Sequence, residues 1–346
     1  MVVMHWFEFL FETTNHETAK MKLLEVPIID IAPFTHGSAT DKLAVAKAVD
    51  RACRDIGFLV IQGHGVSSQL LATVRRVSRG FFDLPLAEKQ RVARPEKDVA
   101  RGYIGLDEES LARSRDPSAY GSDLNESLMI GPVDELPAGY AFAPEAGKHF
   151  APNIWPENPA RLRDAYTAYY RAMGELAQTL MRIFAVALNL PERHFDNLID
   201  RHISRLRVRN YPEQLTAPMP GQIRAGAHSD YGSLTILAAE DKPGGLQVCN
   251  AAGQWVDVPI AADCFIVNIG DLLALWTNDT WVSTLHRVVN PPANAGAGSR
   301  RQSLVFFHNP NYDADIVSLV PDAAPKYAPT TSGNHLRKLF TATQNG

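Results

Sequence analysis

The sequence predicts a mainly β protein with flanking helices, whose core is a double-stranded β-helix, the jelly-roll or cupin-like architecture. Two observations favour this fold class. Up to Pro191, long segments keep apolar residues at helical spacing; after it, short β-prone runs alternate with Gly, Pro and Asn turns. Many short strands at such spacing are typical of a double-sheet jelly roll. The runs cover residues 206–211, 233–238, 245–248, 255–258, 265–269, 284–289 and 303–308.

The first half of the chain is predicted to be mostly helical. Helices are expected at 41–56, with Gly57 as the C-terminal stop, and at 68–82. The longest helix should cover 156–190, with Asn158 as its cap and Pro159 in its first turn. Buried strands are expected at 26–33 and 58–61, a functional loop or lid at 106–150, and a short helix near 335–340.

Composition excludes several classes of protein. Hydrophobic residues make up 45% and charged residues 21%, as in an ordinary globular protein, and the net charge of -4 argues against a nucleic-acid binder. The three cysteines form no C-x-x-C pair, which favours a reducing, cytoplasmic location. The apolar start, residues 1–11, lacks the features of a signal peptide and is too short to span a membrane. Residues 1–25 are therefore expected to form a disordered N-terminal extension, with Met21 as an alternative start.

A metal site is predicted around His228 and Asp230. Residues two apart on an extended strand point to the same face, so both side chains can reach one ion. His286, in another strand-like run, is the candidate third ligand. Two histidines and one carboxylate are typical of non-haem Fe(II) oxygenases. The His-x-Asp triplet alone is weak, because a hydrogen-bonded surface histidine has the same pattern.

A carboxylate-binding pair is predicted at Arg301 and Ser303, which also share one strand face. Arginine presents a planar fork of donors and serine a hydroxyl, a combination that suits a carboxylate. Arg300 competes for the role, but alternation with the apolar Leu304 and Phe306 favours Arg301.

From Val26 to about Tyr327, the ordered set His-x-Asp, distant His and Arg-x-Ser resembles the isopenicillin N synthase-like family of Fe(II)- and 2-oxoglutarate-dependent dioxygenases. The resemblance implies a helix-flanked jelly roll divided into an N-terminal region, 26–150, and a helix-backed catalytic region, 151–346, in one compact unit. It also implies the cofactors Fe(II), 2-oxoglutarate and dioxygen. His228, Asp230 and His286 would bind the metal, and Arg301, Ser303 and Tyr211 the 2-oxoglutarate.

The activity so implied is hydroxylation, desaturation or cyclisation of a small organic molecule, with succinate and carbon dioxide as coproducts. Two alternatives stay open: an Fe(II) oxidase that does not use 2-oxoglutarate, and a non-catalytic jelly-roll binding protein. Arg205, Arg207 and Arg209 would share one strand face, which fits either an anionic substrate or a solvated surface. The motifs around Asp271 and His308 are interpreted as structural. No pattern identifies the substrate or the oligomeric state.

Overall fold

The computed structural model describes residues 25–106, 108–114, 121–135, 149–293, 295, 298–320 and 324–344. The predicted N-terminal extension lies outside this part of the chain, apart from Glu25, and so does much of the predicted 106–150 loop. The seven strands predicted after Pro191 are all present.

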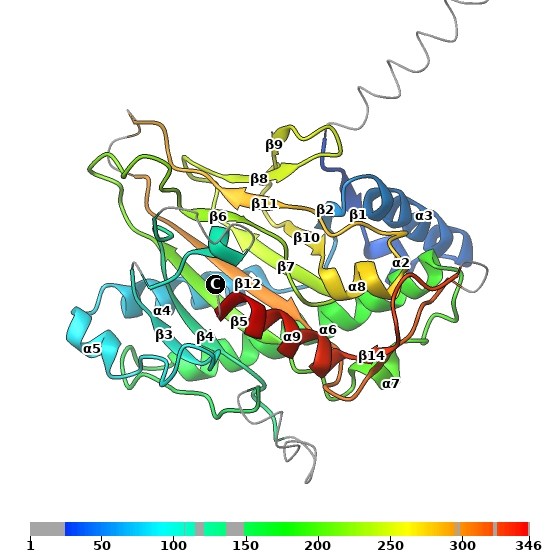
Figure 1. The fold of residues 1–346 in the computed structure, drawn as a ribbon, viewed down its shortest axis with the longest axis horizontal. Coiled ribbons are helices and arrows are strands. Elements are labelled where there is room, and N and C mark those ends of the chain that lie inside the picture. Colours follow the sequence, from blue (N-terminus) through cyan, green and yellow to red (C-terminus); the bar gives the residue numbers. More distant parts are fainter. Residues whose placement is uncertain are drawn as a thin grey trace, which may run out of the picture.

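Two facing sheets form the core of the molecule (Figure 1). The large sheet has eight strands in the order β1-β2-β10-β7-β12-β5-β4-β3, and the small sheet has four in the order β6-β11-β8-β9. Apolar side chains from both sheets meet between them in one cluster. The strands of the large sheet, in that order, are Ile28–Asp30, Phe58–Gln62, Phe265–Ile269, Leu234–Ala239, Arg301–His308, Arg205–Tyr211, Glu126–Ile130 and Gly102–Ile104. Those of the small sheet are Ala225–His228, His286–Val288, Leu246–Cys249 and Trp255–Asp257. A third pair joins β13 (Asp315–Ile316) to β14 (Thr330–Thr331).

Helices cover the outer face of the large sheet. They are α3 (Ala39–Asp55), α4 (Ser68–Phe82) and α6 (Leu162–Ala187), and their apolar stripes pack with strand residues in the largest core cluster. Ser38 and Asp41 form a capping box that begins α3, and Gly57 follows that helix with φ +66°, so its predicted stop is confirmed. The expected cap of the longest helix is wrong, because α6 begins after Arg161 and Asn158 lies outside it.

Shorter helices fill the connections. They are α2 (Ala32–His36), α5 (Leu86–Gln90), α7 (Asp196–Ile199), α8 (Asp271–Trp276) and the 3₁₀ helix η1 (Leu111–Ser114). The C-terminal α9 (Ser332–Gln344) confirms the helix expected near 335–340 and lies over β5 in Figure 1. None of the helices in the described ranges is long and apolar enough to cross a membrane.

Strand β4 corrects the prediction of a continuous loop at 106–150. Its residues Glu126–Ile130 are all buried in the large sheet, so the alternation that marks a half-exposed strand is missing. The polar Glu126 accepts hydrogen bonds from Lys89 Nζ (2.7 Å), Tyr103 OH (2.6 Å) and Asn210 Nδ2 (2.9 Å). A carboxylate inside a sheet is tolerated because these three donors replace water.

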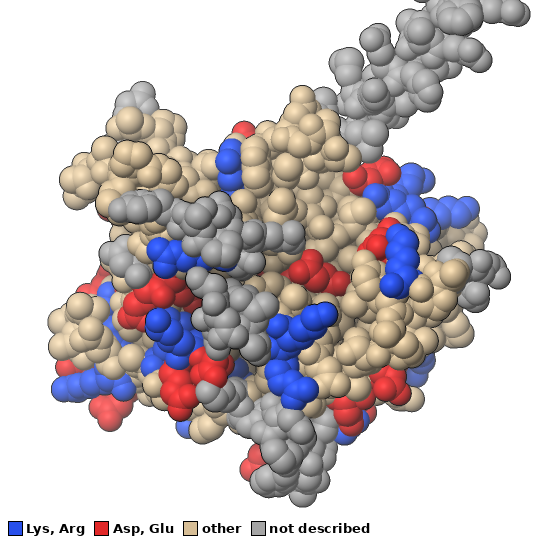
Figure 2. Space-filling model, in the orientation of Figure 1, with Lys and Arg blue, Asp and Glu red and all other residues tan. Residues whose placement is uncertain are grey.

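Charges of both signs are mixed on the face that carries α9. Figure 2 shows Lys and Arg next to Asp and Glu over the lower part of this face, with few charges over β8 and β11. On this side of the molecule, positive and negative side chains are therefore interspersed and do not form one large basic area.

Candidate active site

Three predicted metal ligands meet at one end of the two sheets. One ligand atom from each of His228, Asp230 and His286 lies within 4.8 Å of the others. His228 ends β6 and is paired directly with His286, the first residue of β11. Asp230 lies two residues past the end of β6, so it reaches the site from outside the strand. Its Oδ1 is 3.8 Å from Nε2 of each histidine.

Hydrogen bonds fix which atoms face the centre of this cluster. Nδ1 of His228 donates to the Gly226 carbonyl (2.7 Å), and Nδ1 of His286 donates to the Thr284 carbonyl (3.0 Å). A carbonyl oxygen only accepts, so each Nδ1 carries the proton and each Nε2 keeps a free lone pair. This tautomer is the one that metal-binding histidines use.

Asp230 is oriented by the large sheet. Its Oδ2 accepts from Thr235 Oγ1 of β7 (2.6 Å) and from Asn268 Nδ2 of β10 (2.8 Å), which leaves Oδ1 toward the histidines. The small sheet therefore supplies both imidazoles, and the large sheet holds the carboxylate. Two nitrogen lone pairs and one carboxylate oxygen on one side of a point fit Fe(II).

Burial sets the protonation of the cluster. Burial, together with the neighbouring His286, lowers the pKa of His228 to about 3, so the His228 imidazole stays neutral. Burial alone would raise the pKa of Asp230, but His286, His228 and the bonds from Thr235 and Asn268 outweigh it, and the pKa lies below its usual value. These are the forms that bind a metal ion.

Asp271 accepts hydrogen bonds from both segments that carry the candidate metal ligands. Its Oδ2 accepts from Ser229 Oγ (3.0 Å), between His228 and Asp230, and its Oδ1 accepts from Ser283 Oγ (2.6 Å), shortly before His286. Its backbone N–H also donates to the Asp230 carbonyl (2.7 Å). The interpretation of the Asp271 motif as structural agrees with these contacts, but its link to both segments was not foreseen.

Arg301 and Ser303 point into the space between the sheets. Leu304 and Phe306 pack in the helix-side cluster, and Arg301 lies directly opposite Tyr211 of β5, whose ring is 5.8 Å from the guanidinium. Arg301 is only 1% exposed; its Nη1 donates to the Gly244 carbonyl (2.5 Å), whereas Nε has no partner among the described residues. Arg301 forms no ion pair within the described part of the chain. A buried guanidinium in this state is suited to bind an anion.

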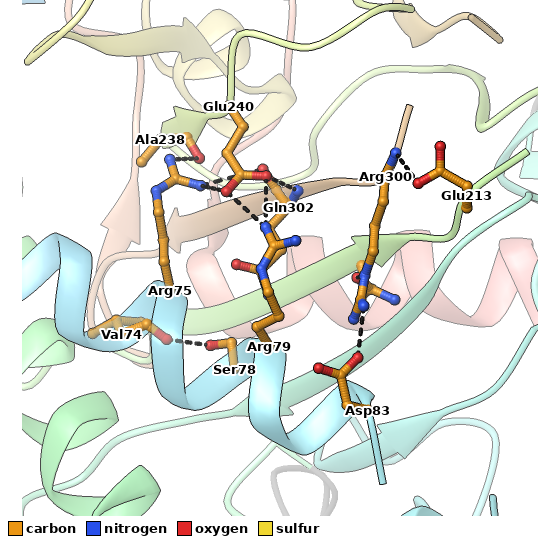
Figure 3. Close-up of polar contacts among 11 residues, drawn as sticks. Val74, Arg75, Ser78, Arg79, Asp83, Glu213, Ala238, Glu240, Arg300 and Gln302 are labelled. Atoms are coloured by element: carbon orange, nitrogen blue, oxygen red, sulfur yellow. Dashed lines mark hydrogen bonds and ion pairs between the residues drawn. The ribbon is translucent and has the colours of Figure 1, made fainter. Parts of the chain in front are cut away.

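Arg300 extends toward Asp83 at the end of α4, as Figure 3 shows. Its Nη1 pairs with Asp83 Oδ1 (2.6 Å) and its Nε donates to Asn210 Oδ1 (3.1 Å). Of the two arginines, Arg301 faces the space between the sheets, whereas Arg300 is already occupied by Asp83 and Asn210.

A cavity of about 810 Å³ opens beside His228 and Asp230. The β5 residues Arg205, Arg207 and Arg209 form part of its wall, and all three are buried. A solvated strand face, one of the two interpretations of these arginines, is therefore wrong. The rest of the wall includes further charged and polar side chains, such as Lys97 and Glu108, and also apolar ones, among them Ile104, Met129, Phe307, Leu336 and Phe340.

Comparison with known proteins decides the family. Residues 202–310 match the family model of the 2OG-Fe(II) oxygenase superfamily, and residues 26–158 match the N-terminal model described as non-haem dioxygenase in morphine synthesis. The 2-oxoglutarate-Fe(II) type oxidoreductase hxnY of Emericella nidulans is 32% identical over 324 residues, covering 91% of this chain and 89% of the relative. The chain belongs to the isopenicillin N synthase-like family of 2-oxoglutarate- and Fe(II)-dependent oxygenases.

Solved structures that are similar to this chain agree with the family assignment. A full-length Neurospora crassa protein in complex with alpha-KG and thymine has a TM-score of 0.80 and 33% identity, covering 92% of this chain and 97% of that one. JOX2 in complex with 2OG, Fe and JA has a TM-score of 0.73 and 25% identity, covering 93% of this chain and 88% of that one. The predicted fold class, the dioxygenase activity and the cofactors Fe(II), 2-oxoglutarate and dioxygen are confirmed.

Proposed function

We propose that His228, Asp230 and His286 hold the Fe(II) of this oxygenase, and that Arg301, Ser303 and Tyr211 bind 2-oxoglutarate. The observation that carries the proposal is the convergence of two free Nε2 lone pairs and one free carboxylate oxygen beside a cavity. The regions 26–150 and 151–346 are proposed to act as one unit, since strands from both share the large sheet.

The residues of the site have separate tasks. Bound Fe(II), with 2-oxoglutarate and dioxygen, supplies the oxidising chemistry and yields succinate and carbon dioxide. Thr235 and Asn268 hold Asp230 with one oxygen toward the histidines. Arg301 pairs with the far carboxylate of 2-oxoglutarate, and Ser303 and Tyr211 add hydroxyl donors on the same face. Burial of the guanidinium keeps water from competing for that carboxylate.

The substrate is proposed to be a small, anionic organic molecule, with hydroxylation as the reaction. Relatives support a small molecule, because the Neurospora crassa protein is solved with thymine. The three buried β5 arginines support a negative charge on the molecule that enters this cavity. A cytoplasmic location is proposed because Cys53, Cys249 and Cys264 are all free thiols.

Substitution of Asp230 tests the metal assignment. Asp230→Ala should abolish Fe(II) binding, oxygen uptake and succinate formation, because one of the three ligands is lost. Asp257→Ala, which removes an exposed carboxylate on β9, is the matched control and should behave like the unaltered protein. Fe(II) binding by Asp230→Ala at unaltered affinity would refute the assignment.

A further inference from the structure

The three arginines of β5 differ in their partners. Arg207 is neutralised by Glu109 and also donates to Ser127 Oγ (3.0 Å). Arg209 donates to the side-chain carbonyl of Asn125 (3.0 Å). Within the described ranges Arg205 makes one side-chain hydrogen bond, from Nη2 to Nδ1 of His149 (2.9 Å). A guanidinium has five N–H donors, so Arg205 keeps most of its capacity unused.

Among the residues that the structure describes, Arg205 is a buried cation without a counter-ion. Its side chain is 8% exposed, and it forms no ion pair with an acidic residue in the part of the chain that the structure describes. Burial and the neighbouring cation Arg101 lower its pKa to about 9. His149 adds no negative charge; burial and the arginines around it lower its pKa to about 3, which keeps its ring neutral. Buried charges are normally paired, so this one is suited to an anion from outside the chain.

The strand register shows how far Arg205 lies from the proposed metal ligands. Arg205, Phe307 and Thr235 lie opposite one another on the adjacent strands β5, β12 and β7. Neighbouring strands are about 4.8 Å apart, so the Cα atoms of Arg205 and Thr235 are roughly 10 Å apart. The Thr235 hydroxyl holds Asp230. An anion bound to Arg205 would thus place the rest of a compact molecule over Phe307, toward the metal.

The cover of this position is apolar. The Phe340 ring of α9 lies 4.5 Å from the Arg205 guanidinium and also packs edge-on against Tyr231. Phe340 and Leu336 close the cavity from one side, and Ile104, Met129 and Phe307 line other parts of its wall. A cation–π contact leaves the donor edge of the guanidinium free for a ligand in the plane of the fork.

We propose that Arg205 binds the carboxylate of the primary substrate, and that this substrate is a compact monocarboxylate with an apolar body. A single carboxylate follows because Glu109 lies beside both Arg207 and Arg209, and the apolar body follows from Phe307 and Phe340, which lie next to Arg205 in the cavity wall. The planar fork of arginine matches a carboxylate with two parallel hydrogen bonds. This inference rests on the proposed function, because it takes the cavity beside His228 and Asp230 to be the substrate site.

A binding measurement in the absence of turnover tests the proposed role of Arg205. The full chain, loaded with Mn(II) and saturated with 2-oxoglutarate, is titrated by calorimetry with benzoate, phenylacetate and hexanoate and with their neutral amides. At least one acid should bind tenfold or more tightly than its amide, a difference of about 1.4 kcal/mol. Arg205→Gln should lose this preference and Arg205→Lys should keep part of it. Arg51→Gln, at an exposed position of α3, should keep it fully.

Two results would overturn the proposal: acids that bind no better than their amides throughout the panel, or a preference retained by Arg205→Gln. The first comparison uses only the unaltered protein, so it stands even if a variant does not fold. Failure of Mn(II) or 2-oxoglutarate to bind the unaltered protein would instead refute the proposed function, and it is read in a separate titration.

Discussion

Replacing Arg301 with glutamine should separate 2-oxoglutarate binding from folding. The guanidinium is buried, donates one hydrogen bond to Gly244 and has an unpartnered Nε. Without ligand, the variant loses that single bond, about 1 kcal/mol, and also a buried charge that had no counter-ion. With 2-oxoglutarate, it loses the partner of the far carboxylate.

The expected loss of affinity follows from two charge-assisted hydrogen bonds. Each contributes about 1.5–3 kcal/mol, so at least about 3 kcal/mol is lost and Kd rises on the order of 100-fold. At a ligand concentration of about 100 times Kd, 2-oxoglutarate stabilises the unaltered protein by about 2.7 kcal/mol. The same concentration stabilises the variant by only about 0.4 kcal/mol. At about 2 °C per kcal/mol for a chain of this size, the shift in Tm should fall from roughly 5 °C to under about 1 °C.

Thermal unfolding of the Mn(II)-loaded protein, with and without 2-oxoglutarate, measures both quantities. The matched control is Arg300→Gln, which removes a neighbouring arginine that pairs with Asp83 on the other side of the sheet. Its ion pair is partly exposed and contributes about 0–1 kcal/mol, so its ligand-induced shift should equal that of the unaltered protein. A full shift in Arg301→Gln, or a lost shift in Arg300→Gln, would refute the assignment of the carboxylate site.

Two further substitutions probe the surroundings of the site. Asp271→Ala removes the hydrogen bonds that Asp271 accepts from Ser229 and Ser283 and should weaken metal affinity by about 10–100-fold in an anaerobic Fe(II) titration; unchanged affinity would show that the proposed ligands do not depend on these bonds. For Glu109, burial would raise the pKa, but Arg207 and Arg209 outweigh it and hold the pKa below 4.5. The stability it contributes is therefore present above pH 4.5 and is lost as the pH falls through the lower, folded-state pKa. Denaturant unfolding of Glu109→Gln should show a deficit at about pH 7 that shrinks toward about pH 3, and a constant deficit would contradict this account.

Local patterns predicted most of the fold because helices and half-exposed strands carry a period. The stripe of α6 and the seven strands after Pro191 were found in this way. Strand β4 has no such period, since both of its faces are buried and its polar residues are matched by partners far along the chain, such as Lys89. Its sequence does not contain those partners, so only the tertiary structure reveals it.

The features of the candidate site divide in the same way: some follow from the local sequence pattern, and others depend on the tertiary structure. Side chains on one strand face, such as Arg301 and Ser303, follow from alternation, and the structure places them as expected. The tautomers of the two histidines depend on backbone carbonyls, which no residue type encodes. Whether an acidic side chain of the described residues lies next to Arg205 depends on the fold, and the sequence alone does not show it.

The division of the proposed metal ligands between the sheets has a consequence beyond catalysis. His228 and His286 belong to the small sheet, whereas Asp230 is anchored through Thr235 and Asn268 to the large one. A ferrous ion bound to all three would be a cross-link between the two layers, in addition to the apolar contacts between them and the hydrogen bonds from Ser229 and Ser283 to Asp271. Removal of iron should therefore lower the Tm of the protein and speed its cleavage by an added protease, which thermal unfolding and limited proteolysis with and without Fe(II) would measure.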